Sequence, residues 1–127
     1  MEESKRQKQV GQVVMEEMTD IFIREGVNII KGGMVSISKV AVTPDLLEAR
    51  IYLSLYKIDD PEQLVQQIAD RTPEWRNLLG RRVRHQLRRV PELRFYIDDT
   101  LDHVYKMEEL FKSLNIAPEK GEEGTGS

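Results

Sequence analysis

Residues 72–90 read TPEWRNLLGRRVRHQLRRV, a pattern that predicts one amphipathic helix around which the rest of the fold is arranged. At roughly 100° per residue, the apolar side chains share one side of this helix: Trp75, Leu78, Leu79, Val83, Leu87 and Val90. The basic side chains lie on the other side, with Arg81, Arg84, His85 and Arg88 at its centre and Arg82 and Arg89 at its edges. Like charges three and four residues apart weaken a helix by roughly 0.2–0.5 kcal/mol per pair, so an anionic partner would stabilise this segment.

The positive charge of the chain is concentrated in this region. From Arg71 to Arg94 there are eight arginines and two glutamates, a formal charge of +6, whereas the whole chain carries −3 and the remainder therefore −9. A charge run can be only a solvated helix face, and that interpretation stays open. Arginine nevertheless suits phosphate, because its planar guanidinium donates two parallel hydrogen bonds. The pattern favours nucleic acid as the partner.

The composition limits the other possibilities. A chain of 127 residues with 39% apolar content suits one domain with one modest core. The absence of cysteine excludes disulfides, thiolate zinc sites and a cysteine nucleophile. No apolar run approaches the roughly 20 residues of a membrane span, and the N-terminus lacks the apolar segment of a signal peptide. We therefore expect a cytoplasmic protein that neither contacts a membrane nor takes a cofactor or small-molecule substrate.

The N-terminal half predicts a helix followed by a hairpin. The helix runs from Ser4 to about Glu25 and ends at Gly26, which takes the left-handed conformation without a Cβ clash. Its start is basic through Lys5, Arg6 and Lys8, either as a solvated helix end or as a second RNA contact. Two strands follow at 34–42 and 47–56, antiparallel across a short turn, with a change of parity in the first that suggests a bulge.

The C-terminal half predicts a broken helix, a strand and a last helix. Asp60 caps a short helix that ends in a kink at residues 71–73, where Thr72 caps the long basic helix and Pro73 occupies its first position. Pro91 ends that helix, and a third strand at 92–98 should lie parallel to the second, since a helical crossover joins them. A final helix at 99–114 and a disordered acidic tail at 115–127 complete the chain.

The predicted fold class is therefore α+β. The order is α-β-β-α-kink-α-β with a C-terminal helix, and a three-stranded mixed sheet has helices on one face. Residues 1–114 form one domain. A βααβ unit with a helix break that faces phosphate is the plan of the KH module, which clamps single-stranded nucleic acid between two helices.

Several segments together carry a family resemblance: 41–54, 78–84, 90–95, 98–101 and 106–110. In order and spacing they resemble the ribosome-binding factor A family over roughly residues 5–114. The resemblance implies a type II KH-like domain without catalytic activity, acting as a monomer. It also implies binding to the 16S rRNA of the 30S subunit, with a role in late subunit maturation, pre-rRNA processing and adaptation to cold.

The basic residues are the candidate RNA contacts. Arg81, Arg84 and Arg88 are predicted to contact phosphates and His85 to donate a hydrogen bond or stack, with Arg71, Arg76, Arg82 and Arg89 at the rim. The resemblance implies an Ala-x-Gly element at the kink, where this chain has Arg71-Thr72-Pro73 instead. Arg71 and Thr72 would then contact phosphate in place of a close glycine backbone.

The sequence also allows two other functions. A metal-dependent nuclease would use the cluster Asp98, Asp99, Asp102 and His103, although acids at a helix start are more simply explained by the exposed N–H groups there. Alternatively, the arginine face would bind an acidic protein. Trp75 is expected in the core, whereas Tyr52 and Tyr56 would stack bases only if their sheet face is open.

Overall fold

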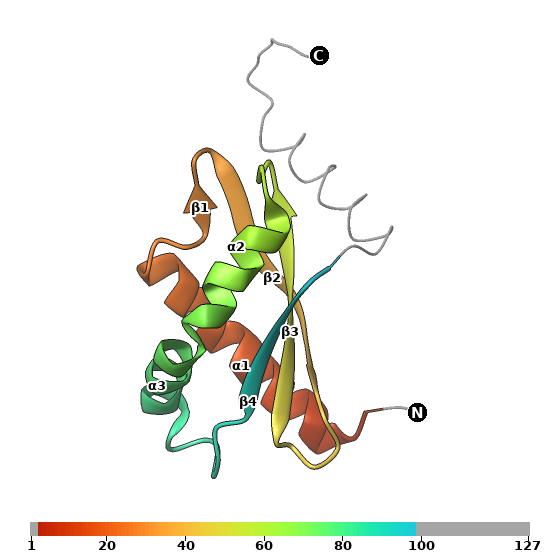
Figure 1. Ribbon diagram of the computed structural model, residues 1–127. Coiled ribbons are helices and arrows are strands. Elements are labelled where there is room, and N and C mark those ends of the chain that lie inside the picture. The colour runs from red at the N-terminus through yellow and green to blue at the C-terminus, as the bar shows by residue number, and fades with distance from the viewer. Residues whose placement is uncertain (1–2, 99–127) are drawn as a thin grey trace, which may run out of the picture.

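The computed structural model describes residues 3–98. Three helices and four strands follow one another along the chain (Figure 1): α1 Lys5–Arg24, β1 Ile29–Ile30, β2 Gly33–Val42, β3 Glu48–Tyr56, α2 Pro61–Asp70, α3 Thr72–Val83 and β4 Glu92–Ile97. The predicted last helix, the tail, Asp99, Asp102 and His103 lie outside the described residues.

Local side-chain chemistry sets both ends of α1. The backbone N–H of Gln7 donates to Ser4 Oγ (3.1 Å) and the Ser4 N–H donates to Gln7 Oε1 (2.7 Å), a reciprocal capping box. At the other end Gly26 has φ 75°, and the Val27 N–H donates to the Phe22 carbonyl at 2.9 Å. A glycine in the left-handed conformation thus ends the helix, as predicted. The predicted bounds of this helix are confirmed.

The sheet has the order β1-β2-β3-β4, with β2 antiparallel to β3 and β3 parallel to β4. The predicted hairpin, the parallel crossover and the bulge, which falls between Ile37 and Lys39, are confirmed. The prediction of three strands was wrong by one, since β1 pairs with the start of β2. Lys31 and Gly32, both at positive φ, form the two-residue turn between them, in a segment that reads as loop from sequence alone.

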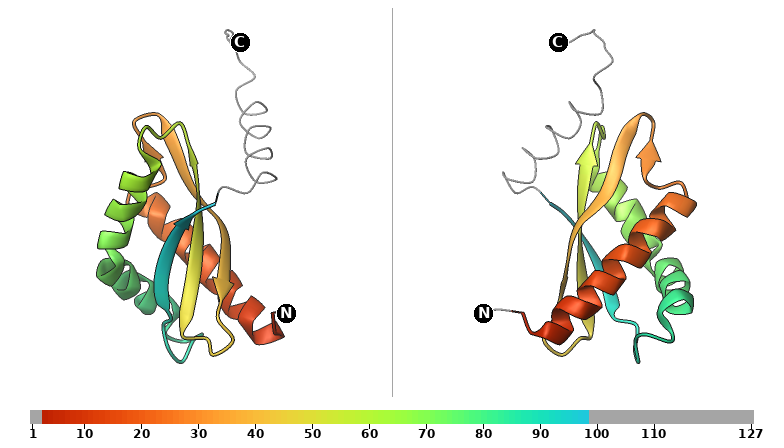
Figure 2. Two further views of the ribbon diagram at one scale, coloured as in Figure 1. Left: turned by 45° about the vertical axis from the view of Figure 1, so that its right-hand side comes forward. Right: turned by 180° about the vertical axis from the view of Figure 1, so that it is seen from behind.

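The helices cover one face of the sheet, and no described element covers the other (Figure 2). Between helices and sheet lies the core, whose largest fully buried side chains include Trp75, Phe22 and Met18. The Trp75 ring lies 5.2 Å from that of Phe22, and its Nε1–H donates to the Ile68 carbonyl at 2.8 Å. The expectation that Trp75 packs in the core is confirmed.

The helix break occurs where it was predicted, but the second helix is shorter. Asp60 caps α2 through the Gln63 N–H (3.1 Å), and α2 and α3 meet at Arg71. Thr72 does not cap α3, since its hydroxyl instead donates back to the Ala69 carbonyl at 2.6 Å.

The prediction of helix to Val90 was wrong, because α3 ends at Val83. The N–H groups of Gln86 and Leu87 both donate to the Val83 carbonyl (2.8 Å), and the chain then turns so that Leu87 becomes buried. Residues 84–91, which we call the basic loop, lead from there to β4. The charged residues of this segment therefore do not form one helix face.

Candidate nucleic-acid interface

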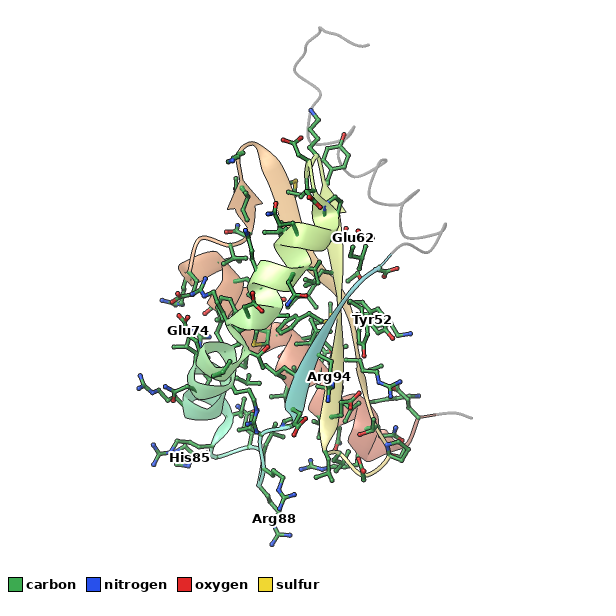
Figure 3. The ribbon with its side chains drawn as sticks, in the orientation of Figure 1. Tyr52, Glu62, Glu74, His85, Arg88 and Arg94 are labelled. Atoms are coloured by element: carbon green, nitrogen blue, oxygen red, sulfur yellow. The ribbon has the colours of Figure 1, made fainter. Side chains whose placement is uncertain are left out.

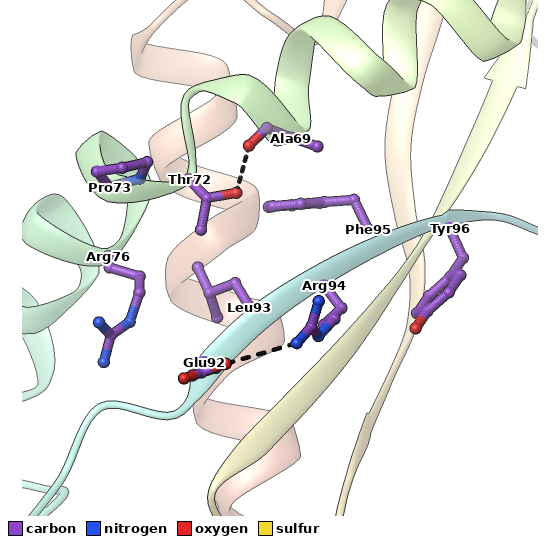
Figure 4. A pocket seen from close by; sticks show the side chains of 9 residues that line it. All are labelled: Ala69, Thr72, Pro73, Arg76, Glu92, Leu93, Arg94, Phe95 and Tyr96. Atoms are coloured by element: carbon purple, nitrogen blue, oxygen red, sulfur yellow. Dashed lines mark hydrogen bonds and ion pairs between the residues drawn. The ribbon is translucent and has the colours of Figure 1, made fainter.

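A groove of about 650 Å³ lies between the helix break and strand β4 (Figure 4). We call it the kink groove. Its lining residues come from α2 and α3 on one wall and from β4 on the other: Ala69, Thr72, Pro73, Arg76, Glu92, Leu93, Arg94, Phe95 and Tyr96. Its volume falls within the range of sites that hold small ligands, roughly 300–1,000 Å³, and is therefore ample for a nucleotide.

The strand wall of the groove carries backbone groups that make no hydrogen bond within residues 3–98. β4 is an edge strand, and the N–H groups of Glu92 and Asp98 donate to the carbonyls of Leu47 and Leu53 on the β3 side at 2.8 Å. Because alternate residues of a parallel strand point their backbone groups to opposite sides, those of Leu93 and Phe95 face away from β3. They offer donors and acceptors to the edge of a nucleobase.

Arg76 connects this groove to the basic loop. Its Nε–H donates to the Pro91 carbonyl (3.2 Å) and its Nη2 to the Val90 carbonyl (2.9 Å), which fixes the end of the loop against α3. A guanidinium has five N–H donors, so three remain for a ligand in the groove. Arg76 is exposed and lines the groove.

Arg71 and Arg82 already have carboxylate partners in this chain. Arg71 Nη2 lies 2.7 Å from Glu74 and 3.1 Å from Glu25, with its guanidinium 4.2 Å above the centre of the Trp75 ring. The hydrogen bond from Arg71 lowers the pKa of Glu74. Arg71 therefore contributes to holding the helices together as well as to surface charge.

Arg82 makes the corresponding connection between α3 and α1. Its Nη1 lies 2.7 Å from Asp20 and 3.0 Å from Glu17. The pKa of Asp20 is lowered by hydrogen bonds from Arg24 first and from Arg82 second. The pKa of Arg82 is raised, chiefly by its hydrogen bond to Asp20.

Within residues 71–94, four arginines and one histidine make no ion pair or hydrogen bond with any of residues 3–98. These exposed residues are Arg81, Arg84, His85, Arg88 and Arg89. Arg81 lies on the last turn of α3 and the others on the basic loop, at one end of the molecule (Figure 3). Cations without carboxylate partners are the ones that phosphate binds without first displacing an ion pair.

The basic start of α1 lies beside this loop. Arg6 lines one hollow of about 370 Å³ together with Arg88 and Arg89, and Asp45 of the β2–β3 turn lies on its rim. Lys5 and Lys8 are exposed on the same end of the helix. Two basic segments separated by some 80 residues of sequence thus form one surface, which the sequence could not indicate.

Three exposed β4 residues of the groove were not predicted as contacts: Glu92, Arg94 and Tyr96. The sequence pattern of β4 could have indicated them, because exposed and more buried side chains alternate along this strand. Glu92, Arg94 and Tyr96 are exposed, whereas Leu93 is buried. The proposed nuclease cluster gains no support. Asp98 accepts a hydrogen bond from Ser38 Oγ at 2.6 Å, and residues 3–98 contain no group of three or more His, Cys, Asp or Glu placed to hold a metal ion. No helix within the described range is long and apolar enough to cross a membrane.

A βααβ unit whose helix break faces a parallel edge strand across a groove defines a type II KH-like domain, as expected. Residues 6–111 match the sequence profile of the family described as Ribosome-binding factor A. The chain belongs to the ribosome-binding factor A family.

Individual relatives agree with this assignment. The ribosome-binding factor A of Cytophaga hutchinsonii is 37% identical over 121 residues, which cover 95% of this chain and 90% of that protein. That of Flavobacterium psychrophilum is 40% identical over 109 residues, 84% of this chain and 82% of the relative. The crystal structure of ribosome-binding factor A from Thermus thermophilus has a TM-score of 0.51 at 19% identity, covers 72% of this chain and 90% of its own, and supports the fold.

Proposed function

We propose that this protein is a non-enzymatic ribosome assembly factor that binds the 16S rRNA of the 30S subunit in the cytoplasm. As a monomer, and without a cofactor, it assists late 30S maturation and pre-rRNA processing, including during growth in the cold. Family membership supports the assignment to ribosome assembly. The observation that carries RNA binding is the set of cations without carboxylate partners at one end of the domain, formed by the basic loop and the start of α1.

The geometry suggests a division of roles. The basic loop and Arg6 bind phosphates, which gives affinity without reading sequence. The kink groove accepts an unpaired nucleotide, whose base meets the free backbone groups of β4 while its phosphate meets Arg76. Base edges are accessible to a protein mainly in single-stranded RNA, because an A-form duplex hides them. Such a protein would recognise a junction between duplex and unpaired RNA.

The test is cosedimentation with small ribosomal subunits, both mature and precursor, with large subunits as a specificity control. The wild type is compared with Arg84/Arg88/Arg89→Gln, which removes three exposed cations of the basic loop. A matched control, Arg24/Lys31/Lys57→Gln, removes three exposed cations outside the basic loop, at the end of α1, in the β1–β2 turn and just after β3, and produces the same net charge. We expect the wild type and the control to bind precursor subunits in preference to mature ones, and the loop variant to bind at least tenfold more weakly.

Two results would contradict the proposal. Equal binding of small and large subunits by the wild type would contradict the proposed role in 30S maturation. Equal binding by the loop variant and the wild type would remove the basic loop from the interface. Competition between RNA and an acidic polypeptide for the loop would then show whether a protein is the partner instead.

A further inference from the structure

The sheet face that the helices leave uncovered carries an ordered set of aromatic and basic side chains. In the parallel register of β3 and β4, Tyr52 pairs with Tyr96 and Arg50 with Arg94. The two tyrosine rings are stacked, with centroids 5.4 Å apart and planes 27° from parallel. Lys39 of β2 places its Nζ 5.6 Å from the centre of the Tyr52 ring. We call this surface the open sheet face; Figure 3 labels Tyr52 and Arg94 on it.

The cations of this face are accessible to a new partner. Arg50 lies 2.8 Å from Glu48, and Arg94 lies 3.6 Å from the same carboxylate and 3.7 Å from Glu92. The side chains of Arg50 and Arg94 are 49% and 58% exposed, and ion pairs at such exposure contribute little to stability. They can therefore be exchanged for phosphate. Lys39 has no carboxylate partner among residues 3–98.

The open sheet face is continuous with the kink groove. Tyr96 and Arg94 line the groove and also stand on the open face, because β4 is the edge strand between the two (Figure 4). A single strand that leaves the groove over β4 would meet the rings of Tyr96 and then Tyr52. Tyr52 belongs to β3 and does not line the groove. A substitution of Tyr52 therefore tests binding to the open sheet face without changing the lining of the groove.

We propose that the open sheet face is a second RNA contact, specific for single-stranded RNA. Bases stack on the Tyr52–Tyr96 pair, while Lys39, Arg50 and Arg94 neutralise the adjoining phosphates. Aromatic platforms flanked by cations bind single strands in this way, since every base offers a face for stacking. This inference rests on the proposed function and deepens it, because it adds a region of unpaired RNA to the segment held by the basic loop.

The test measures the affinity of the full-length protein for two labelled probes by fluorescence anisotropy: a 12-nucleotide single strand of uridines and adenines, and a perfectly paired RNA hairpin. Tyr52→Leu removes the ring, and Tyr52→Phe keeps it without the hydroxyl. Ile29→Ala is the control, since it removes an exposed apolar side chain from β1, at the opposite edge of the sheet from β4 and beside α1. Fluorescence of Trp75, the single tryptophan and fully buried, verifies that each variant is folded.

We expect Tyr52→Leu to weaken single-strand binding roughly tenfold, the loss typical of one stacked base, and to leave hairpin binding unchanged. Tyr52→Phe and Ile29→Ala should stay within about twofold of the wild type. The proposal is overturned if folded Tyr52→Leu keeps its single-strand affinity, or loses affinity for both probes alike. A gain in affinity would also overturn it, since another occupant would then cover the face. These results are independent of the cosedimentation test, in which the basic loop is varied and Tyr52 is not.

Discussion

At the scale of single residues, the neighbouring carboxylates decide what each arginine does. Arg71 and Arg82 have two carboxylate partners each, from their own helix or from α1, and contribute to the packing of the helices. Arg84 and Arg88 belong to the same basic stretch of sequence but have no such partner within residues 3–98. The arginines therefore form one group in the sequence but two groups in the structure. One group is paired with carboxylates, and the other has no carboxylate partner among residues 3–98.

Substitution of a glycine by alanine tests how closely the backbone is packed at that position. A Cβ added at Gly33 would lie 2.5 Å from the Lys57 carbonyl oxygen and 2.7 Å from that of Tyr56, both backbone atoms that cannot move aside. Gly33→Ala should therefore destabilise the fold by about 1–3 kcal/mol, the usual cost of overpacking. The measurement is urea denaturation followed by the fluorescence of Trp75.

The control for this prediction is Gly80→Ala in α3. Its Cβ would meet Val90 Cγ2 at 3.4 Å, an ordinary contact, while alanine favours a helix over glycine by up to about 1 kcal/mol. We expect this variant to be as stable as the wild type or more stable. Equal destabilisation by both substitutions would show that Gly33 does not make the close contact described.

At the scale of helices and strands, the sequence predicts elements that carry their own start and stop signals. Ser4 and Gly26 bound α1, and Asp60 with Pro61 starts α2, so these ends were predictable. No such signal marks the end of α3. Between Val83 and Pro91 the apolar spacing continues, and only burial of Leu87 against the assembled core turns the chain away from the helix axis.

The candidate site was predictable in composition but not in arrangement. Every arginine predicted to contact RNA is on the surface or at its edge, yet the single face expected for Arg81, Arg84 and Arg88 depended on a helix that ends at Val83. The contact between Arg6 and the basic loop requires tertiary structure, as does the groove wall formed by Arg94 and Tyr96. Local patterns specify which residues are exposed, whereas the fold decides which exposed residues meet.

The ion pairs between α1 and α3 predict a dependence of stability on pH. Because the pKa of Asp20 is lower in the folded state than in the unfolded chain, its ion pairs stabilise the fold at pH values above about 4, where an ordinary aspartate is ionised. The stabilisation is lost as the pH falls through the folded-state pKa. Arg82→Gln should therefore lower the melting temperature at pH 7, and its difference from the wild type should shrink below pH 4.

Thermal denaturation at intervals from pH 7 to pH 3 measures this difference. Arg81→Gln, one position earlier and without a carboxylate partner among residues 3–98, is the control and should show no such trend. A constant difference between Arg82→Gln and the wild type down to pH 3 would contradict the assignment of the effect to Asp20.

At the scale of the whole molecule, charge is distributed along the long axis of the domain. The basic loop and the start of α1 lie at one end, while acids at the start of α2, including Glu62, lie toward the other (Figure 3). The chain as a whole is acidic, with a formal charge of −3. Its net charge therefore repels RNA weakly, and binding depends on surfaces where the local charge is positive, foremost the end formed by the basic loop and the start of α1.

This distribution predicts that the position of a cation matters more than net charge. In a plot of log affinity for a 16S rRNA fragment against log salt concentration, each phosphate contact contributes a slope of about −0.7 to −0.9. Arg84/Arg88/Arg89→Gln should thus make the slope shallower by roughly two to three. Arg24/Lys31/Lys57→Gln, with an identical net charge, should leave it close to that of the wild type. If both variants changed the slope equally, binding would depend on the total charge of the protein, and the basic loop would have no special role. A shallower slope in the loop variant alone would locate the phosphate contacts at the end of the domain where α1 begins and the basic loop lies.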